Sequence, residues 1–473
     1  MDKEEFKKYG HEFVDWVADY LDNVGEYPVC PDVNPGDIKK QLPKQAPNKG
    51  ESLEKIFKDF KEKIFPGMTH WQHPSWFAYF PANNSPPSVL AELLTAGMGA
   101  QCMIWKTSPA AAELEEVVME WLKEMLGLPD EMVGVIQDTA SASSLVALLT
   151  AREKTTGFSS NVKGIKDPLV VYCSEEAHSS VEKGAKIAGF GRENIRSIST
   201  DKNYAMIPEE LEKIISKDKN KGFKPCCVTA TSGTTSSSAI DPLDEIGKIC
   251  RRHHLWLHVD AAYAGTAAVL PEKRWVLKGV EYADSFVFNP HKWMLTNFDC
   301  SAYFVKDPEA LKRTFEIHPE YLKTGVDAEV KNFRDWGVAL GRRFRALKLW
   351  FVLRYYGVQG LQEMVRKHIK LAQYFKSRVE ESENFELMAP VPLSLVCFRL
   401  NDGRSEDELN KTNKKLLEEV NQTGKIHVTH TTLKGKYVIR MCVASRTTQE
   451  QDVKNAWKTI REKADEILTQ PSI

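Results

Sequence analysis

The chain has 473 residues, of which 42% are hydrophobic and 27% charged, which is typical of a soluble globular protein with two or three domains. Its 64 basic and 65 acidic residues give a formal net charge of −1, so the charge favours neither nucleic acid nor an anionic membrane as a partner. No apolar run reaches membrane-spanning length, and residues 1–6 (MDKEEF) lack the apolar core of a signal peptide, so we expect a cytoplasmic protein. The nine cysteines form no CxxC pair, which favours reduced thiols over disulfides or a zinc site.

The first 85 residues predict an arm rather than a core. Residues 4–22 have a helical pattern with one apolar face, made of Phe6, Phe13, Val14, Val17, Tyr20 and Leu21. The proline-rich residues 28–47 predict an extended crossing segment. Because neither part can bury much surface alone, we expect residues 1–85 to pack on another domain or subunit.

From residue 109 onward, helical and strand patterns alternate. The helical patterns cover residues 110–126, 141–154, 179–188, 208–217 and 242–253. The apolar or β-branched runs cover residues 134–137, 169–173, 197–199, 226–231, 255–259 and 285–288. This alternation predicts βαβ units and an α/β fold with a mainly parallel sheet, covered on both faces.

Polar residues that could carry chemistry follow these strands. They are Thr139, His178, Thr235, Asp260 and Lys292. Ligands of parallel α/β sheets bind at the carboxyl ends of the strands, so these residues are expected to share one site.

The C-terminal part predicts a smaller α/β unit. Residues 343–382 form a long helical pattern that leads out of the large domain. Strand patterns then cover residues 394–400, 426–429 and 437–443, and a last helix is expected over residues 451–468. We therefore divide the chain into an N-terminal helical arm, a large domain and a small domain, with bounds 1–85, 86–365 and 366–473.

Lys292 and Asp260 are the most informative pair. Lys292 follows the apolar residues 285–288, and burial favours the neutral amine that forms a Schiff base. Asp260 ends another apolar strand, where a carboxylate can pair with a pyridinium nitrogen. The alternative is a solvated lysine and a turn-capping aspartate, but both residues at strand ends of one chain favour pyridoxal 5′-phosphate as the cofactor.

Two further strand ends suit such a cofactor. Residues 137–143 (QDTASAS) predict a helix N-terminus rich in hydroxyl groups, which can bind a phosphate or can simply cap the helix. The imidazole of His178 could stack on a flat ring, although a lone histidine is more often a satisfied loop residue. Neither a P-loop nor a strand followed by GxGxxG is present, which disfavours a nucleotide.

At this point the chain resembles the group II pyridoxal-phosphate-dependent amino acid decarboxylases of fold type I, in particular the aromatic-L-amino-acid decarboxylases. The resemblance covers almost the whole length. Its motifs are residues 71–74 (WQHP), 77–81 (FAYFP), 108–110 (SPA), 258–263 (HVDAAY), 289–293 (NPHKW), 297–300 (NFDC) and 341–345 (GRRFR).

The resemblance implies a seven-stranded, mainly parallel sheet and a role for each matching residue. Lys292 would bind the cofactor aldehyde, Asp260 would pair with the ring nitrogen and His178 would stack on the ring. Further cofactor contacts would come from Ala140, Ser141, Thr235, Asn289, His291 and Gly341. No metal is expected, since His253 and His254 lack further ligands at suitable spacing.

Tyr321 matches the family's catalytic tyrosine, on a polar loop at about residues 316–335 that would close over the substrate. It would donate the proton that completes the amine. Relatives with phenylalanine at this position tend to be aldehyde synthases. Tyr321, and histidine rather than asparagine at position 178, therefore favour decarboxylation.

The resemblance also implies an aromatic substrate and a homodimer with its active site at the subunit boundary. Aromatic side chains would form the substrate pocket, and Gly341 would leave room for a bulky ring. The substrate-binding residues would be Trp71, Tyr79, Phe80, Pro81, Ala82 and Met103. Tryptophan, phenylalanine, tyrosine and dopa stay open as substrates, and an aldehyde synthase, a decarboxylase of a non-aromatic acid and a silent scaffold relative stay open as alternatives.

Overall fold

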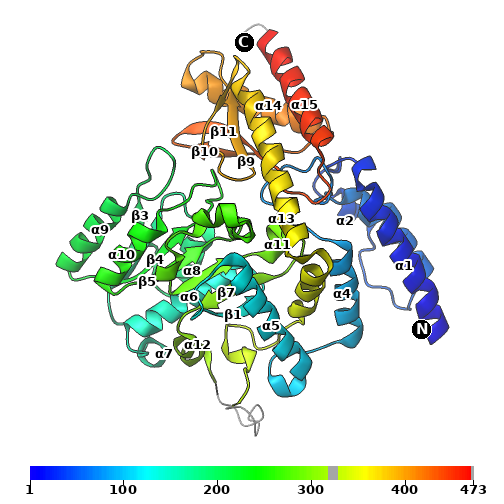
Figure 1. Ribbon diagram of the computed structural model, residues 1–473. Helices are drawn as coiled ribbons and strands as arrows, with labels where there is room; N and C mark the ends of the chain where they lie inside the picture. The colour runs from blue at the N-terminus through cyan, green and yellow to red at the C-terminus, as the bar shows by residue number, and fades with distance from the viewer. Residues whose placement is uncertain (318–328, 470–473) are drawn as a thin grey trace.

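A computed structural model describes residues 1–317 and 329–469 of the chain. It contains a large sheet of seven strands in the order β1-β7-β6-β5-β4-β2-β3 and a small sheet of four strands (Figure 1). The strands of the large sheet are β1 (Val133–Gln137), β2 (Leu169–Ser174), β3 (Ile195–Ile198), β4 (Lys224–Thr231), β5 (Trp256–Asp260), β6 (Ser285–Phe288) and β7 (Ser301–Val305).

The large sheet is mainly parallel, as the sequence predicts. Strands β3, β2, β4, β5 and β6 run parallel, and only β7 is antiparallel, to both of its neighbours β1 and β6. The strand patterns located six of the seven strands and missed β7. Because β7 returns beside β6 without a long crossover helix, it does not continue the strand–helix alternation used to find the others.

The large sheet lies between two hydrophobic cores, and successive side chains of each strand point alternately into one core and the other. In β6, for example, Phe286 and Phe288 belong to one core and Val287 to the other. Both faces of the sheet are therefore buried, which explains why the strands appear in the sequence as continuous apolar runs. The covering helices are α5 (Pro109–Leu126), α6 (Ala140–Thr155), α7 (Ser160–Lys163), α8 (Ser179–Ile187), α9 (Pro208–Asn220), α10 (Leu243–His253) and α12 (Pro308–Phe315).

The small sheet is antiparallel, in the order β10-β11-β9-β8, and lies at the top of the molecule with its helices (Figure 1). Its strands are β8 (Phe385–Leu387), β9 (Leu395–Leu400), β10 (Thr429–Leu433) and β11 (Lys436–Cys442), and its helices are α14 (Glu406–Gln422) and α15 (Glu450–Thr469). A strand was expected over residues 426–429, but the observed strand β10 begins only at Thr429. The three-residue strand β8 was missed because it is too short to show a period.

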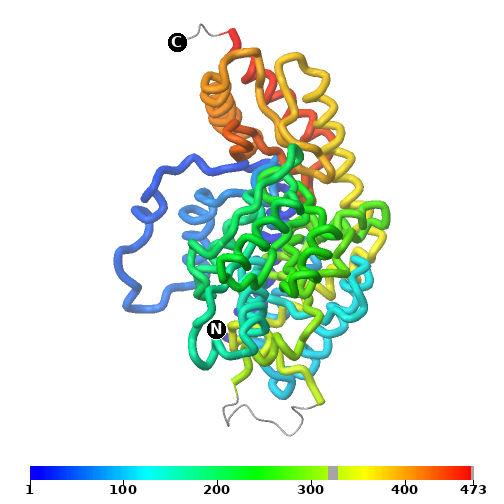
Figure 2. The backbone as a smooth tube through the Cα atoms, turned by 90° about the vertical axis from the view of Figure 1, so that its left-hand side faces the viewer, coloured from blue at the N-terminus to red at the C-terminus, as the bar shows by residue number. Residues whose placement is uncertain are grey.

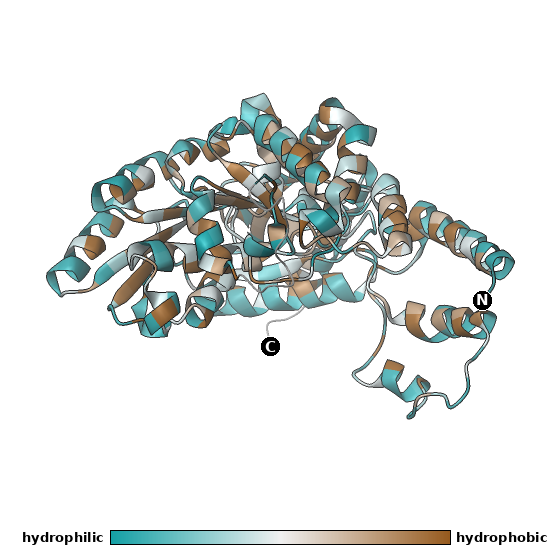
Figure 3. Cartoon of the chain, turned by 90° about the horizontal axis from the view of Figure 1, so that it is seen from below, coloured by the Kyte–Doolittle hydropathy of each residue, from teal (hydrophilic) through white to brown (hydrophobic). Residues whose placement is uncertain are grey.

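The long helix α13 (Arg345–Glu380) connects the two sheets, and Gly357 interrupts it with a φ of 65°. The N-terminal arm lies at one side of the body, as Figures 2 and 3 show. It contains α1 (Lys3–Asn23), α2 (Asp37–Gln41) and α3 (Leu53–Asp59), so the proline-rich segment is not wholly extended. Trp16 of α1 packs edge-on against Phe60 and Phe65, which holds the arm together.

The arm and the neighbouring helix α4 (Pro86–Met98) leave apolar side chains uncovered. Phe6 of α1 is 65% exposed. On α4, the exposed residues are Leu90, Leu93, Leu94 and Met98. Within the described ranges, no helix combines the length and apolar character that a bilayer crossing needs.

Candidate functional site

A cavity of about 250 Å³ opens at the carboxyl ends of β4, β5 and β6. Six segments that are far apart in the sequence meet there, as the strand-end argument predicts. The lining residues are Phe80, Thr139, Ala140, Ser141, His178, Thr231, Gly233, Thr235, Asp260, Ala262, Tyr263, Asn289, His291, Lys292 and Phe298.

Lys292 lies in α11 (Pro290–Trp293), a single helical turn that begins directly after β6. Its backbone N–H donates to the Asn289 carbonyl at 2.9 Å, and its own carbonyl accepts from Asn83 Nδ2 at 2.8 Å. Its ammonium nitrogen lies 5.2 Å from the centroid of the Phe80 ring. Burial lowers the pKa of Lys292, with Asp260 acting in the opposite direction, so the nucleophilic neutral amine is easier to reach than in water.

Asp260 is the last residue of β5 and is 5% exposed. One carboxylate oxygen accepts the Ala262 backbone N–H at 3.0 Å, which fixes the orientation of the side chain. The aspartate ends β5, the lysine follows the neighbouring parallel strand β6, and both line the same cavity.

His258, in the same strand as Asp260, helps to hold β5 in place beside its neighbours. No role was assigned to it from the sequence. It lies two residues before Asp260, so both side chains are on the same face of β5. Its ring nitrogens contact Ser285 Oγ at 2.9 Å and Ser144 Oγ at 3.2 Å, which connects β5 to β6 and α6. Burial lowers the pKa of His258 to about 4, so the ring is neutral near pH 7.

The N-terminus of α6 forms another wall. Thr139 caps the helix by accepting the Ala142 N–H at 3.3 Å, while Ala140 and Ser141 line the cavity. The first N–H groups of a helix have no intrahelical partner and bind anions. The buried Asn289 Oδ1 also has no hydrogen-bond partner within the described residues. A phosphate group fits the free N–H groups at this helix end, whereas the Asn289 oxygen, an acceptor, requires a hydrogen-bond donor.

Two neutral histidines line the cavity. The Nδ1 atom of His178 accepts the Ser180 N–H at 3.2 Å, and that of His291 accepts the Cys300 N–H at 2.9 Å. These contacts leave the proton of each neutral ring on Nε2. Burial lowers the pKa of His178, and it lowers that of His291 to about 3.

The turn after β4 needs a glycine. Gly233 has a φ of 88°, and a Cβ there would lie 2.6 Å from the Ala264 Cβ. Thr235, in the same turn, accepts a hydrogen bond from Arg440 Nη2 at 2.6 Å through its carbonyl. Arg440 comes from β11 of the small sheet, and its only signal in the sequence is a charge within an apolar strand.

Tyr263 completes the floor and was likewise not assigned from the sequence. Its ring stacks on Phe80, with centroids 3.9 Å apart, and on Trp293 at 4.7 Å. Its place in the HVDAAY motif was the available signal. The stack fixes the position of Phe80 in the cavity wall.

Several residues predicted to bind substrate or cofactor do not line this cavity. Trp71 and Tyr79 are 36% and 53% exposed and stack on each other with centroids 5.7 Å apart. The other four are Pro81, Ala82, Met103 and Gly341. Tyr321 lies outside the described residues. Within those residues, no group of three or more histidine, cysteine, aspartate or glutamate side chains is arranged to hold a metal ion.

Comparisons with known proteins agree with this chemistry. The model of the pyridoxal-dependent decarboxylase conserved domain matches residues 35–401. The phenylacetaldehyde synthase of Arabidopsis thaliana is 45% identical, over 99% of this chain and 97% of its own. The aromatic-L-amino-acid decarboxylase of Rattus norvegicus is 44% identical, over 99% of both chains. A crystal structure of Oryza sativa TDC with PLP and tryptamine superposes with a TM-score of 0.96 at 37% identity, over 99% of both chains.

The fold, the cavity and these matches lead to one conclusion. The cavity offers an amine, a carboxylate and a helix N-terminus, which suit the aldehyde, the ring nitrogen and the phosphate of pyridoxal 5′-phosphate, and the fold is fold type I. The enzyme is a carboxy-lyase that uses this cofactor. The chain belongs to the pyridoxal-dependent decarboxylase family.

Proposed function

We propose that this enzyme decarboxylates an aromatic L-amino acid to the corresponding arylalkylamine and carbon dioxide. The observation that carries the proposal is that Lys292, Asp260 and His178 line one cavity of about 250 Å³. The family fixes the type of reaction, and the cavity wall and the relatives support the aromatic substrate.

Each residue has a separate task. Lys292 would hold the cofactor aldehyde through its amine. Asp260 would keep the ring nitrogen protonated by ion pairing, and His178 would pack against the ring. When bound, pyridoxal phosphate supplies a ring that accepts the electron pair left by carbon dioxide. Ala140, Ser141, Asn289 and His291 would hold the phosphate, and Thr235 would complete the cofactor site.

Tyr321 donates the proton that replaces the carboxylate at the substrate's α-carbon. This assignment rests on the family motif, because the residue lies outside the described part of the chain. Without this donor, the electron pair would stay available to oxygen, and an aldehyde would result.

The wall around Phe80 favours an aromatic side chain. The Phe80 ring lines the cavity and is held by the stack on Tyr263. Among the described residues that line the cavity, none is an arginine that could pair with an acidic substrate. Arg440 lies behind Phe80, but its guanidinium already donates to the Thr235 and Ser236 carbonyls and to Thr429 Oγ1.

We further propose a homodimer, with the arm of residues 1–85 and helix α4 at its interface. The exposed leucines of α4 form an apolar surface that a second copy would cover. The partner would also enclose the exposed pair Trp71 and Tyr79, which, with Pro81, Ala82 and Met103, would then line the substrate pocket. The three-domain division at residues 85 and 365 belongs to the same proposal. Eight of the nine cysteines are buried thiols, which suits a reducing, cytoplasmic compartment.

A second candidate is an aromatic aldehyde synthase, which the match to the phenylacetaldehyde synthase of Arabidopsis thaliana favours. Both reactions begin with loss of carbon dioxide, so release of carbon dioxide cannot separate them. The products can.

The test is a substrate panel with the purified, cofactor-loaded enzyme. Tryptophan, phenylalanine, tyrosine and dopa are each incubated in air, with glutamate as the acidic control, and amine, aldehyde and peroxide are quantified. We expect amine from at least one aromatic acid and none from glutamate. Aldehyde with an equal amount of peroxide would establish the second candidate, and the absence of turnover on all four aromatic acids would refute both.

A further inference from the structure

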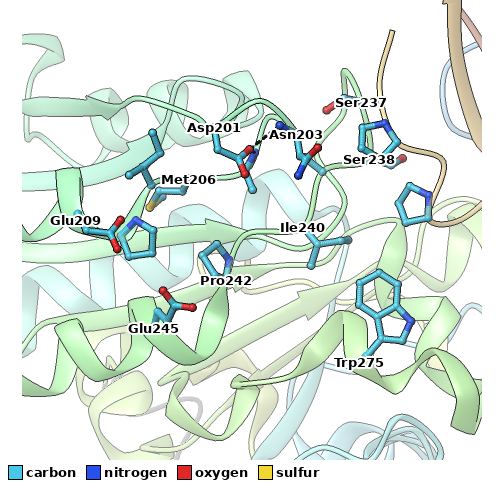
Figure 4. Close-up of a pocket in the computed structure, with 16 residues that line it drawn as sticks. Asp201, Asn203, Met206, Glu209, Ser237, Ser238, Ile240, Pro242, Glu245 and Trp275 are labelled. Atoms are coloured by element: carbon cyan, nitrogen blue, oxygen red, sulfur yellow. Dashed lines mark hydrogen bonds between the residues drawn. The ribbon is translucent and has the colours of Figure 1, made fainter. Parts of the chain in front are cut away.

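The segments that form the cofactor cavity have different surroundings. Residues 237–240, in the loop after β4, line a different cavity of about 480 Å³ (Figure 4). The segment that carries Lys292 is instead hydrogen-bonded to residues 83–88, at the start of α4. Asn83 contacts Lys292 itself, yet it is not among the described residues that line the cofactor cavity. Any effect of Asn83 on the cofactor must therefore act through its neighbours.

All the polar groups of the Asn83 side chain are hydrogen-bonded to backbone. Its Nδ2 donates to the carbonyls of Lys292 and Ala444, both at 2.8 Å. Its Oδ1 accepts the Arg446 N–H at 3.0 Å. A backbone carbonyl only accepts and a backbone N–H only donates, so these partners fix the orientation of the amide. Asn83 is 2% exposed, so the three hydrogen bonds are shielded from water.

These hydrogen bonds join Lys292 to the small domain. Ala444 and Arg446 lie between β11 and α15, whereas Lys292 lies in α11, directly after β6 of the large sheet. The Lys292 carbonyl is near the end of a four-residue helical turn, where carbonyl groups have no partner within the helix. Because a buried carbonyl without a partner is costly, the amide of Asn83 stabilises the turn in this position.

Two serines hold the chain that follows Lys292. Leu295 has a φ of 56°, a left-handed conformation that is unfavourable for a leucine and persists only where surrounding contacts maintain it. Ser85 Oγ donates to the Leu295 carbonyl at 2.8 Å, and Ser88 Oγ accepts the Asn297 N–H at 2.8 Å. Residues 83–88 thus fix the path of residues 292–297 at three points.

We propose that Asn83 is a positioning residue for the reaction, which holds the backbone of Lys292 so that its amine stays in place for the cofactor aldehyde. The inference rests on the role proposed for Lys292. A displacement of about 1 Å at a reacting group is enough to lower turnover strongly. The alternative is that Asn83 stabilises the fold and nothing more, as a buried asparagine can do anywhere in a protein.

Asn413 offers a matched control for this alternative. It is fully buried, its Nδ2 donates to the Leu400 and Leu409 carbonyls, both at 2.9 Å, and its Oδ1 accepts the Leu400 N–H at 2.7 Å. These contacts lie between α14 and β9 in the small domain. Asn413→Ala therefore removes the same number and kind of hydrogen bonds as Asn83→Ala, without altering the turn of Lys292.

The first measurement is hydrogen exchange of the cofactor-loaded enzyme, followed by mass spectrometry. We expect the peptide that covers residues 289–297 to exchange at least about threefold faster in Asn83→Ala than in wild type. The same peptide should exchange at the wild-type rate in Asn413→Ala. Urea unfolding should show a similar loss of stability in both variants.

The second measurement is release of the cofactor after dilution, followed by the visible absorbance of the bound form. We expect release to be about fivefold faster or more in Asn83→Ala, as the loss of a buried hydrogen bond beside Lys292 predicts. With the best aromatic substrate, kcat should fall about tenfold and KM should change less, because the variant alters the position of the amine and not the substrate pocket. Asn413→Ala should match wild type in release, kcat and KM.

Wild-type exchange and release in Asn83→Ala would overturn the proposal, as would equal effects in the two alanine variants. If either alanine variant does not fold, Asn83→Ser and Asn413→Ser, which both keep a hydroxyl donor, are compared by the same criteria. Exchange and release require no turnover, so an enzyme inactive on aromatic acids would refute the proposed function without changing the result for Asn83.

Discussion

Lys292 shows how position changes the chemistry of a common side chain. Burial lowers the pKa of its amine, and Asp260 in the same cavity limits that shift. The residue is also fixed by its backbone, because β6 ends four residues earlier and Asn83 donates a hydrogen bond to its carbonyl. The amine therefore reaches the cavity from a rigid turn.

Replacement of this amine tests its role. We expect Lys292→Ala to lose at least about 10³-fold in kcat, since no other lysine among the described residues lines the cavity to act as the nucleophile. The measurement is amine production together with a circular dichroism spectrum, which should match wild type. Lys278→Ala, at an exposed position outside the cavity, is the control and should keep full activity. Amine production by Lys292→Ala near the wild-type rate would contradict the assignment.

A second prediction at the residue scale concerns Tyr321. We expect Tyr321→Phe to divert most of the product from amine to aldehyde, because the variant keeps the ring and loses only the proton donor. Peroxide and aldehyde are measured beside the amine. Tyr355→Phe, at a position that is 71% exposed, serves as the control. An unchanged amine yield in Tyr321→Phe would remove this residue from the mechanism.

At the scale of single elements, the N-terminus of α6 joins stability and function. Thr139 caps the helix, and the next two residues line the cofactor cavity. We expect Thr139→Ala to lower the free energy of unfolding by about 1 kcal/mol and also to weaken cofactor binding.

The capping box of α14 provides a matched control. Ser405 caps that helix together with Glu408, away from the cavity. Ser405→Ala should lose a similar amount of stability and retain the cofactor like wild type. Denaturant unfolding and cofactor titration measure the two quantities. Equal cofactor affinity in both variants would contradict a phosphate at α6.

The strands illustrate which elements a sequence can predict. β5 and β6 are continuous apolar runs that end at polar residues, so both the strands and the residues that follow them were located correctly. β7 and β8 were missed, since one returns without a crossover and the other is three residues long. Their positions depend on pairing with distant strands rather than on a local pattern.

At the scale of the whole molecule, the exposed face of α4 predicts an interface. Leu93 and Met98 are 54% and 58% exposed. We expect the double variant Leu93→Lys/Met98→Lys to shift the protein from dimer to monomer and to lose activity, because charges would be buried against apolar surface. Analytical ultracentrifugation and amine production are the measurements. Val162→Lys, at an apolar residue of α7 that is 80% exposed, should leave the proposed dimer intact. A wild-type monomer would refute the interface.

Buried histidines predict acid sensitivity. Burial lowers the pKa of His258 to about 4 and the pKa values of His291 and His368 to about 3. In the unfolded chain the histidines have a pKa near 6.5, so that chain takes up protons that the folded protein cannot. The contribution of these histidines to the free energy of unfolding is therefore fully present above about pH 6.5 and is lost as the pH falls toward 3 to 4. Asp241 acts oppositely. Burial raises its pKa to about 6, so its contribution to stability is lost as pH rises from about 4 through 6 and offsets part of the loss caused by the histidines.

We therefore expect the urea midpoint to fall between pH 7 and pH 5. In the wild type, Trp293 Nε1–H donates to His368 Nδ1 at 2.9 Å. In His368→Gln the urea midpoint should fall less with pH, because glutamine can still accept this hydrogen bond but does not titrate. A midpoint that is constant over this range, or an equal slope in the variant, would contradict the prediction.

The sequence by itself determined the parallel α/β fold and most of the polar residues that line the cavity. The information is local, because each of these residues ends or closely follows an apolar run and parallel strands bring their carboxyl ends to one edge of the sheet. The residues are Thr139, His178, Thr235, Asp260 and Lys292. Only the tertiary structure decided what lies behind these residues. The contacts of Arg440 from β11 and the support of His258 by two serines join segments far apart in the chain. No local pattern specifies such contacts, since they depend on how separately formed elements pack against one another.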